Sequence, residues 1–267
     1  MDGLNLNTDK MLASIDNGVG TMTYNQPEKR NAVSHEMRLA ITEILNSFAQ
    51  NPEVRVVVIT GAGGKAFVSG ADISEFDSKR STPEQIADYG AVSRRVGEAY
   101  ASLGKPLIAM IRGYCLGGGL ATALNADIRI ATRDSRFGIP AARLGLGFGF
   151  EGVKSLAAIV GRSNAAEILY TARQFSAEEA LAMGLVNRVV ADDALERTVR
   201  DLAGEIAENA PLTLRSLNFS LRETAKDPGD RDAARIQELI DSCMASEDYI
   251  EGRRAFMEKR KAVFKGR

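Results

Sequence analysis

The chain has 267 residues, 45% of them hydrophobic and 26% charged, which fits one large domain or a main domain with a smaller appendage. Its net charge of -1 argues against general nucleic-acid binding, and no run approaches the roughly 20 apolar residues of a membrane span. Residues 1–10 lack the basic start and apolar middle of a signal peptide. We therefore expect a cytoplasmic protein that binds neither nucleic acid nor membrane.

The cysteines and the histidine exclude several kinds of site. Cys115 and Cys243 are far apart and lack metal-ligand spacing, so neither a disulfide framework nor a metal site is expected. The single histidine, His35, follows Ser34 at an expected helix start, where a solvated residue is far commoner than a catalytic one. A Ser-His-Asp hydrolase would depend on this histidine alone.

The chain opens with a predicted hairpin and a helix. Two β-leaning segments, 11–15 and 19–24, flank Asn17-Gly18, which tolerates positive φ and therefore indicates a tight turn. Ser34 should cap a helix, because apolar residues recur at helical spacing from Met37 to Phe48.

Strands and helices then alternate, which indicates an α/β domain with largely parallel strand pairing. The run VRVVVIT, residues 54–60, is rich in β-branched residues and is typical of a buried strand. Further strands are expected at 106–111, 127–131 and 186–190, and helices at 82–103, 151–160, 164–171 and 176–184.

The last part of the chain lacks strand signals. Helices are expected at 195–207, 212–224, 232–245 and 247–264. We therefore divide the chain into an α/β core, residues 1–192, and a helical region, residues 193–267. The amphipathic helices of this region could cover either the core or a neighbouring subunit.

Two glycine-rich junctions between a strand and a helix are candidates for chemistry. Small residues surround Ala71 in KAFVSGADI, and three glycines end IRGYCLGGG at residue 119. A helix start presents unpaired N–H groups that favour a developing anion, and glycine lets a ligand approach closely. Two such donors aimed at one thioester oxygen would stabilise an enolate or a tetrahedral oxyanion. Taken alone, each stretch is more often a simple tight turn.

A set of short motifs resembles the crotonase superfamily, the enoyl-CoA hydratase/isomerase family, over nearly the whole chain. The motifs that carry the resemblance are NQPEKRNA (25–32), AFVSGADISEF (66–76), GYCLGGG (113–119), ADIRIA (126–131), FGIP (137–140), AMGLVN (182–187) and EGRRAFMEKRKAVFK (251–265). Several weak motifs in the right order make chance similarity improbable.

The resemblance implies a fold and a substrate. The fold would be an α/β, crotonase-like spiral of ββα units with a helical C-terminal oligomerisation region, assembled as a homotrimer or hexamer. The substrate would be an acyl-CoA thioester, with coenzyme A as part of the substrate and no separate cofactor or metal.

The resemblance also implies site residues, carried over position by position. The N–H groups of Ala71 and Gly118 would form an oxyanion hole. The adenine pocket would be lined by Ala71, Asp72 and Ile73, largely through backbone contacts. Lys29 and Arg30 would lie near the phosphates of coenzyme A, and Phe264 and Lys265 near the nucleotide end, in the same or a neighbouring subunit. For each of these basic residues, a solvated surface role is nearly as probable.

One departure from the family pattern bears on the reaction. Family hydratases use two glutamates to position and activate water, and here those positions correspond to Ala121 and Ala141. Alanine cannot transfer a proton, so efficient hydration of an enoyl-CoA is doubtful. Glu151, in an apolar and glycine-rich stretch, is the candidate proton carrier. The alternative for Glu151 is a carboxylate in the first turn of a helix.

These observations leave three functions open. The leading one is an enolate-stabilising acyl-CoA enzyme, an isomerase or another lyase. The others are a thioester hydrolase and a CoA-thioester-binding protein with little catalysis.

Overall fold

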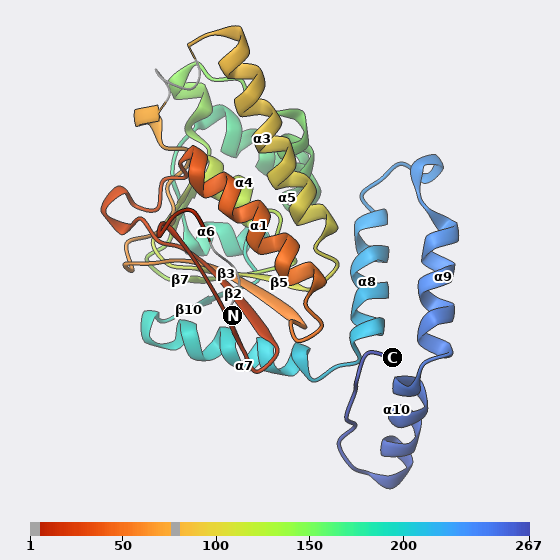
Figure 1. The fold of residues 1–267 in the computed structure, drawn as a ribbon. Helices are drawn as coiled ribbons and strands as arrows, with labels where there is room; N and C mark the ends of the chain where they lie inside the picture. The colour runs from red at the N-terminus through yellow and green to blue at the C-terminus, as the bar shows by residue number, and fades with distance from the viewer. Residues whose placement is uncertain (1–5, 76–80) are drawn as a thin grey trace.

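The computed structural model of the chain describes residues 6–75 and 81–267, and its largest element is a six-stranded sheet (Figure 1). In spatial order, its strands are β1 (Met11–Asp16), β2 (Val19–Tyr24), β3 (Val56–Gly61), β5 (Leu107–Ile111), β7 (Ile128–Thr132) and β10 (Arg188–Val190). β1 and β2 pair antiparallel, whereas the other neighbours pair parallel. The predicted α/β class with largely parallel pairing is confirmed.

The hairpin between β1 and β2 forms for the predicted reason. Asn17 and Gly18 have φ values of 48° and 82°, the left-handed region that these two residue types adopt most easily. The turn sets the register, so that Asp16 pairs with Val19 and Met11 with Tyr24.

The first four residues of β3 are apolar and buried because helices cover both faces of the strand. Val57 and Ile59 belong to the main core on the side of α1 (His35–Gln50), whereas Val56 and Val58 pack with α7 (Leu195–Ala207) on the other side. Figure 1 shows α7 across the sheet from α1 and α3 (Pro83–Ser102). Burial on both sides explains why this strand lacks the alternation of a half-exposed one.

The predicted helix caps are present. The hydroxyl of Ser34 accepts a hydrogen bond from the amide of Met37, at 3.3 Å, and starts α1. Thr82 and Gln85 form a capping box at the start of α3, and Ser176 and Glu179 form one at the start of α6 (Ala177–Ala182).

A second, smaller sheet was not predicted from the sequence. Its strands, in spatial order, are β4 (Ala66–Val68), β6 (Tyr114–Leu116), β8 (Arg136–Gly138) and β9 (Phe175–Ser176). The first three pair parallel to one another. Strands of three residues are too short to show a hydrophobic period, so each looked like part of a turn.

α5 (Phe150–Thr171) is interrupted at one residue. The sequence predicts two helices here, 151–160 and 164–171, and the break between them is Gly161, with φ 76° and ψ 160°. This conformation is accessible almost only to glycine. The two halves therefore continue one helix across a kink.

The last helices lie beside the α/β core (Figure 1). They are α8 (Pro211–Glu223), α9 (Ala233–Met244) and α10 (Glu247–Glu258). The guanidinium of Arg222 in α8 donates to the carbonyl oxygens of Tyr100 and Ala101, at 2.9 and 2.6 Å, which ties this helix to the end of α3. Within the described residues, no helix is long and apolar enough to span a membrane.

The predicted helix over residues 247–264 is wrong at its end. Lys259 has φ 52° and closes α10, and the chain then runs back as an irregular tail. Two donors at Arg260 bond to the carboxylate oxygens of Glu251, at 2.6 and 3.0 Å. These bonds and the left-handed residue outweigh the helical spacing of the tail's apolar residues.

Replacing Gly119 with alanine should destabilise the protein. A β-carbon at Gly119 would lie 1.9 Å from the carbonyl oxygen of Val68, a collision between backbone segments that cannot be relieved by a rotamer change. We expect Gly119→Ala to cost about 1–3 kcal/mol in urea unfolding.

The control is Gly97→Ala in α3, where no atom lies within 4 Å of the added methyl. That variant should gain up to about 1 kcal/mol from helix propensity. Equal urea midpoints for the two variants at one protein concentration would contradict the close contact at Gly119.

Candidate functional site

Three turns meet at the carboxyl ends of the small sheet. The chain leaves β4 towards Gly70 and Ala71, and leaves β6 towards Gly117 and Gly118. It leaves β8 towards the short helix η3 (Pro140–Leu144). Because neighbouring parallel strands end at the same edge, these turns lie side by side, where ligands commonly bind in α/β proteins.

The turn around Ala71 is held on both sides by one residue. The amide of Val33 donates to the carbonyl oxygen of Gly70, at 2.8 Å, and the amide of Asp72 donates to the carbonyl oxygen of Val33, at 3.0 Å. This isolated bridge leaves the amide of Ala71 between the two bonds. Within residues 6–75 and 81–267, no hydrogen bond has this amide as donor.

The amide of Gly118 lies next to that of Ala71. A β-carbon on Gly118 would be 3.6 Å from the Ala71 nitrogen, and one on Gly70 would be 3.8 Å from the Gly118 nitrogen. Gly118 begins α4 (Gly118–Ala123) and is exposed, and in the described part of the chain its amide also donates no hydrogen bond. These distances place the two turns that carry the amides next to each other.

A second feature of the site is a cluster of polar side chains beside Ala71. Asp72 is buried, with 7% of its surface exposed, and its Oδ2 accepts from Lys29 Nζ at 2.8 Å. Its Oδ1 accepts from the amide and the hydroxyl of Ser74, at 3.0 and 2.6 Å. Burial raises the pKa of the Asp72 carboxyl, but the hydrogen bonds from Lys29 and Ser74 outweigh burial and lower the pKa below its usual value.

The loop that carries Lys29 and Arg30 is fixed by a buried asparagine. Asn31 accepts from the amide of Gln26 at 2.9 Å and donates to the carbonyl oxygens of Ala62 and Ala66, at 3.0 and 2.8 Å. Arg30 lies with its guanidinium carbon 5.1 Å from the ring centre of Tyr114 in β6. Asn31 was not among the residues predicted for the site. Asn31 has a positive φ of 56°. Asparagine adopts such values more readily than most residues, so the residue type could have marked this position as a turn.

Ala121 and Ala141 flank the second turn. The amide of Ala121 donates to the carbonyl oxygen of Gly117, at 3.1 Å, and a β-carbon at Gly117 would lie 3.8 Å from Pro140 Cδ. Both alanines are half-buried, and their methyl groups offer no proton donor or acceptor. Ile73, predicted for the adenine pocket, is 64% exposed beside Asp72.

Glu151 lies in the first turn of α5 and is exposed in the single chain. The preceding loop from η3 contains Gly145, Gly147 and Gly149, and a β-carbon at any of these glycines would meet no atom within 4 Å. The carboxylate is therefore reachable by a ligand, and the helix N-terminus also favours it electrostatically. This position is compatible with both interpretations of Glu151, as a proton carrier and as a carboxylate in the first turn of a helix.

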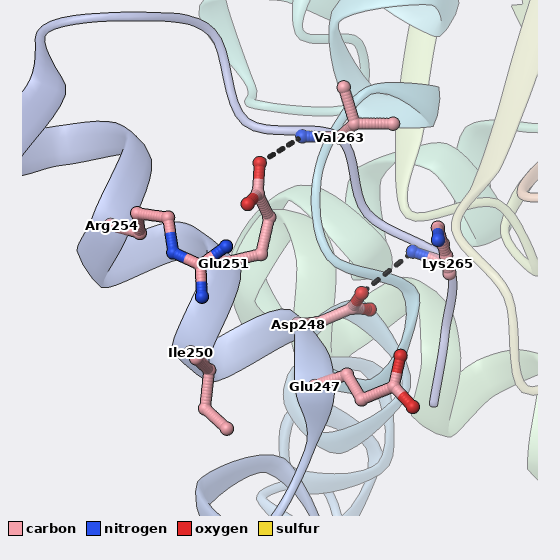
Figure 2. Close-up of a pocket in the computed structure, with 7 residues that line it drawn as sticks. All are labelled: Glu247, Asp248, Ile250, Glu251, Arg254, Val263 and Lys265. Atoms are coloured by element: carbon pink, nitrogen blue, oxygen red, sulfur yellow. Dashed lines mark hydrogen bonds between the residues drawn. The ribbon is translucent and has the colours of Figure 1, made fainter.

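Phe264 and Lys265 lie in the C-terminal tail, in the helical region. The carbonyl oxygen of Phe264 accepts from Arg55 at 2.8 Å, and the amide of Lys265 donates to Asp248 in α10 at 2.6 Å. Figure 2 shows Lys265 at a pocket of about 490 Å³ between α10 and the tail. The structure thus places these two residues against Arg55 and Asp248, and their contact with a nucleotide stays a prediction.

Removing the Lys29 ammonium should raise the pKa of Asp72. In the Lys29→Met variant, only the hydrogen bonds from Ser74 remain to lower the pKa of Asp72. The effect of burial, which raises this pKa, is therefore less opposed. The pKa of Asp72 is lowered in the folded state, so the ion pair stabilises the fold above about pH 4, the unfolded value, and this contribution is lost as pH falls through the folded value.

The titration of Asp72 can be followed by carboxyl ¹³C NMR in both proteins. An unchanged Asp72 pKa in Lys29→Met would show that the lysine does not stabilise the carboxylate. Lys10→Met, which removes a lysine bonded to Glu36 on the surface, is the control and should leave Asp72 unaffected.

Known proteins are similar to this chain over almost its whole length. The sequence model of the family described as enoyl-CoA hydratase/isomerase matches residues 14–267. The short-chain-enoyl-CoA hydratase of Clostridium acetobutylicum is 35% identical over 243 residues, which cover 91% of this chain and 92% of the relative. The crotonyl-CoA hydratase of Syntrophomonas wolfei is 34% identical, over 96% of this chain and 98% of the relative.

The fold matches solved structures equally well. A crystal structure from Magnetospirillum magneticum, described as an enoyl-CoA hydratase/carnithine racemase, has a TM-score of 0.91 and 34% identity, with 97% of each chain covered. The family match over almost the whole chain and the similarity of the fold agree. The chain is therefore an enzyme of the enoyl-CoA hydratase/isomerase family and has the crotonase fold.

Proposed function

We propose that the enzyme binds an acyl-CoA thioester with the thioester oxygen between the N–H groups of Ala71 and Gly118, and that the reaction passes through an enolate. The observation that carries this proposal is the pair of neighbouring amides without a hydrogen-bond acceptor in the described chain. Two donors at this spacing stabilise the charge that develops on the oxygen when an α-proton leaves. α4 has only six residues, so the donors themselves, rather than a long helix dipole, would provide the effect.

Hydration is the competing reaction, because two of the relatives are named as hydratases. Against it stand Ala121 and Ala141, whose methyl groups can neither position nor activate water. We therefore propose an isomerase or another lyase reaction in place of efficient hydration.

Glu151 is our proposed proton carrier. It follows η3 and an open glycine-rich loop, and its exposed position leaves the carboxylate accessible to an acyl group at the turns. A carboxylate within hydrogen-bond reach of the α-carbon could remove a proton and return it elsewhere.

The coenzyme A contacts and the assembly are part of the same proposal. Ala71, Asp72 and Ile73 would line the adenine pocket, and Lys29 and Arg30 would lie near the phosphates. Phe264 and Lys265 would approach the nucleotide from a neighbouring subunit of a homotrimer or hexamer. Support for assembly comes from apolar side chains that are exposed on the C-terminal helices and tail: Leu217, Leu221, Met244, Ile250, Phe256, Met257 and Val263.

Exchange of α-protons with D₂O tests the enolate and the role of Glu151. The wild type should incorporate deuterium at the α-carbon of butyryl-CoA or 3-hydroxybutyryl-CoA, followed by mass spectrometry. Glu151→Gln keeps the shape of the side chain but cannot carry the proton, and it should lower the exchange rate by roughly 10²–10⁴-fold. Glu167→Gln, a second exposed carboxylate on α5, is the control and should exchange at the wild-type rate.

The same samples separate the alternatives. Release of free thiol without exchange would identify a thioester hydrolase, and fast addition of water to crotonyl-CoA would identify a hydratase. Binding by calorimetry without any turnover would favour a CoA-thioester-binding protein. The first and third results would contradict the enolate proposal. Fast hydration would contradict the proposed isomerase or lyase reaction, and unchanged exchange in Glu151→Gln would overturn only the role of Glu151.

A proline at position 118 tests the second donor. Gly118 is the first residue of α4, a position that proline tolerates, so Gly118→Pro removes the N–H and keeps a helix start. We expect a roughly hundred- to thousand-fold lower exchange rate, the usual effect of losing one such donor.

Gly118→Ala is the matched control, because it adds a β-carbon at a normal contact distance and keeps the N–H. Both variants should be checked by circular dichroism and thermal melting. Equal exchange rates in the alanine and proline variants would show that the Gly118 amide takes no part.

A further inference from the structure

The carboxylate of Asp72 is already fully engaged within the protein. Three donors, Lys29 Nζ and the amide and hydroxyl of Ser74, bond to its two oxygens at 2.6–3.0 Å. Lys29 Nζ also donates to the hydroxyl of Ser74, at 3.1 Å, which closes the cluster. Because Asp72 is buried and its oxygens are occupied, its side chain is arranged to hold the protein rather than to meet a substrate.

The amide of Ala71 is held from both sides. Its N–H shares a planar peptide unit with the carbonyl group of Gly70, whose oxygen accepts from the amide of Val33 at 2.8 Å. The following residue is Asp72, whose own amide is bonded to Val33 and whose side chain is bonded to Lys29 and Ser74. The orientation of the Ala71 N–H therefore depends on two anchors, the bond between Gly70 and Val33 before it and the contacts of Asp72 after it.

We propose that Asp72 is a positioning residue, whose carboxylate holds Lys29 and Ser74 and thereby keeps the Ala71 N–H directed at the acyl oxygen. This inference rests on the proposed function. It adds a role for the side chain of Asp72, a residue that was predicted to contact coenzyme A through its backbone. A misplacement of about 1 Å can cost a hundredfold in rate, so a modest rotation of this peptide is enough to matter.

The chain offers a matched control in Glu223 of α8. Its carboxylate is 3% exposed, bonds to Lys226 at 2.6 Å and accepts from the amide of Asp232 at 2.8 Å. Like Asp72, Glu223 is buried, pairs with a lysine and accepts from a backbone amide. It lies in the helical region, away from the turns of the small sheet. A purely structural role predicts the same behaviour for both carboxylates.

The experiment compares Asp72→Asn with Glu223→Gln. We expect Asp72→Asn to lower kcat for α-proton exchange by roughly tenfold to a hundredfold, with KM and the calorimetric affinity for coenzyme A within twofold of wild type. Glu223→Gln should lower the melting temperature by a similar amount and leave kcat unchanged. Wild-type kcat in Asp72→Asn, or an equal loss of kcat in both variants, would overturn the proposal.

Two further measurements keep the test decisive. If Asp72→Asn does not fold, Ser74→Ala removes one of the three donors and should still lower kcat with KM unchanged, and an unaltered kcat would count against the proposal. A crystal structure of the folded variant should show the Ala71 N–H rotated away from Gly118, and an unmoved amide would refute the positioning role without reference to turnover. Absence of exchange in the wild type would instead reject the proposed function.

Discussion

The pairing of β4, β6 and β8 brings three turns together, and they approach through backbone atoms with no room for side chains between them. A β-carbon at Gly113 would lie 2.1 Å from the carbonyl oxygen of Lys65, and one at Gly138 would lie 2.6 Å from that of Arg173. Gly119 is equally confined against β4. Glycines at these positions let the small sheet close, and the closure places the amides of Ala71 and Gly118 next to each other. The candidate oxyanion site is thus a consequence of backbone packing.

The large sheet and its helices could be predicted from the sequence because their signals are local and long. β3 is a continuous apolar run, and α1 and α3 carry recognisable caps. The small sheet could not be predicted in this way, because its strands have two or three residues and their glycines are typical of turns. The end of α10 was missed for another reason. A left-handed residue and a set of ion pairs stop the helix where the periodicity of the sequence continues.

The candidate site, too, could be predicted from the sequence only in part. The sequence marks Gly118 and the residues around Ala71 as candidates, but only the pairing of β4 with β6 shows that the turns that carry them lie side by side. Lys29 and Asp72, predicted separately for the coenzyme A site, form one ion pair beside Ala71. Asn31 and the side chain of Asp72 were not recognised, because their importance lies in contacts to residues far along the chain. Phe264 and Lys265 contact Arg55 and Asp248, and their role at the nucleotide end stays a prediction.

The break at Gly161 has a mechanical consequence for Glu151. The carboxylate is ten residues before the glycine, which corresponds to a rigid arm of about 15 Å in an α-helix. Both halves of α5 are anchored in the core, the first by Leu156 and Val160 and the second by Ala165 and Ile168, and the two dihedral angles of Gly161 set the angle between them. A rotation of about 4° at this joint displaces the far end by about 1 Å, the scale on which proton transfer is made or lost. If Glu151 carries the proton, as proposed, the conformation of Gly161 and the core contacts of α5 together set the position of its carboxylate.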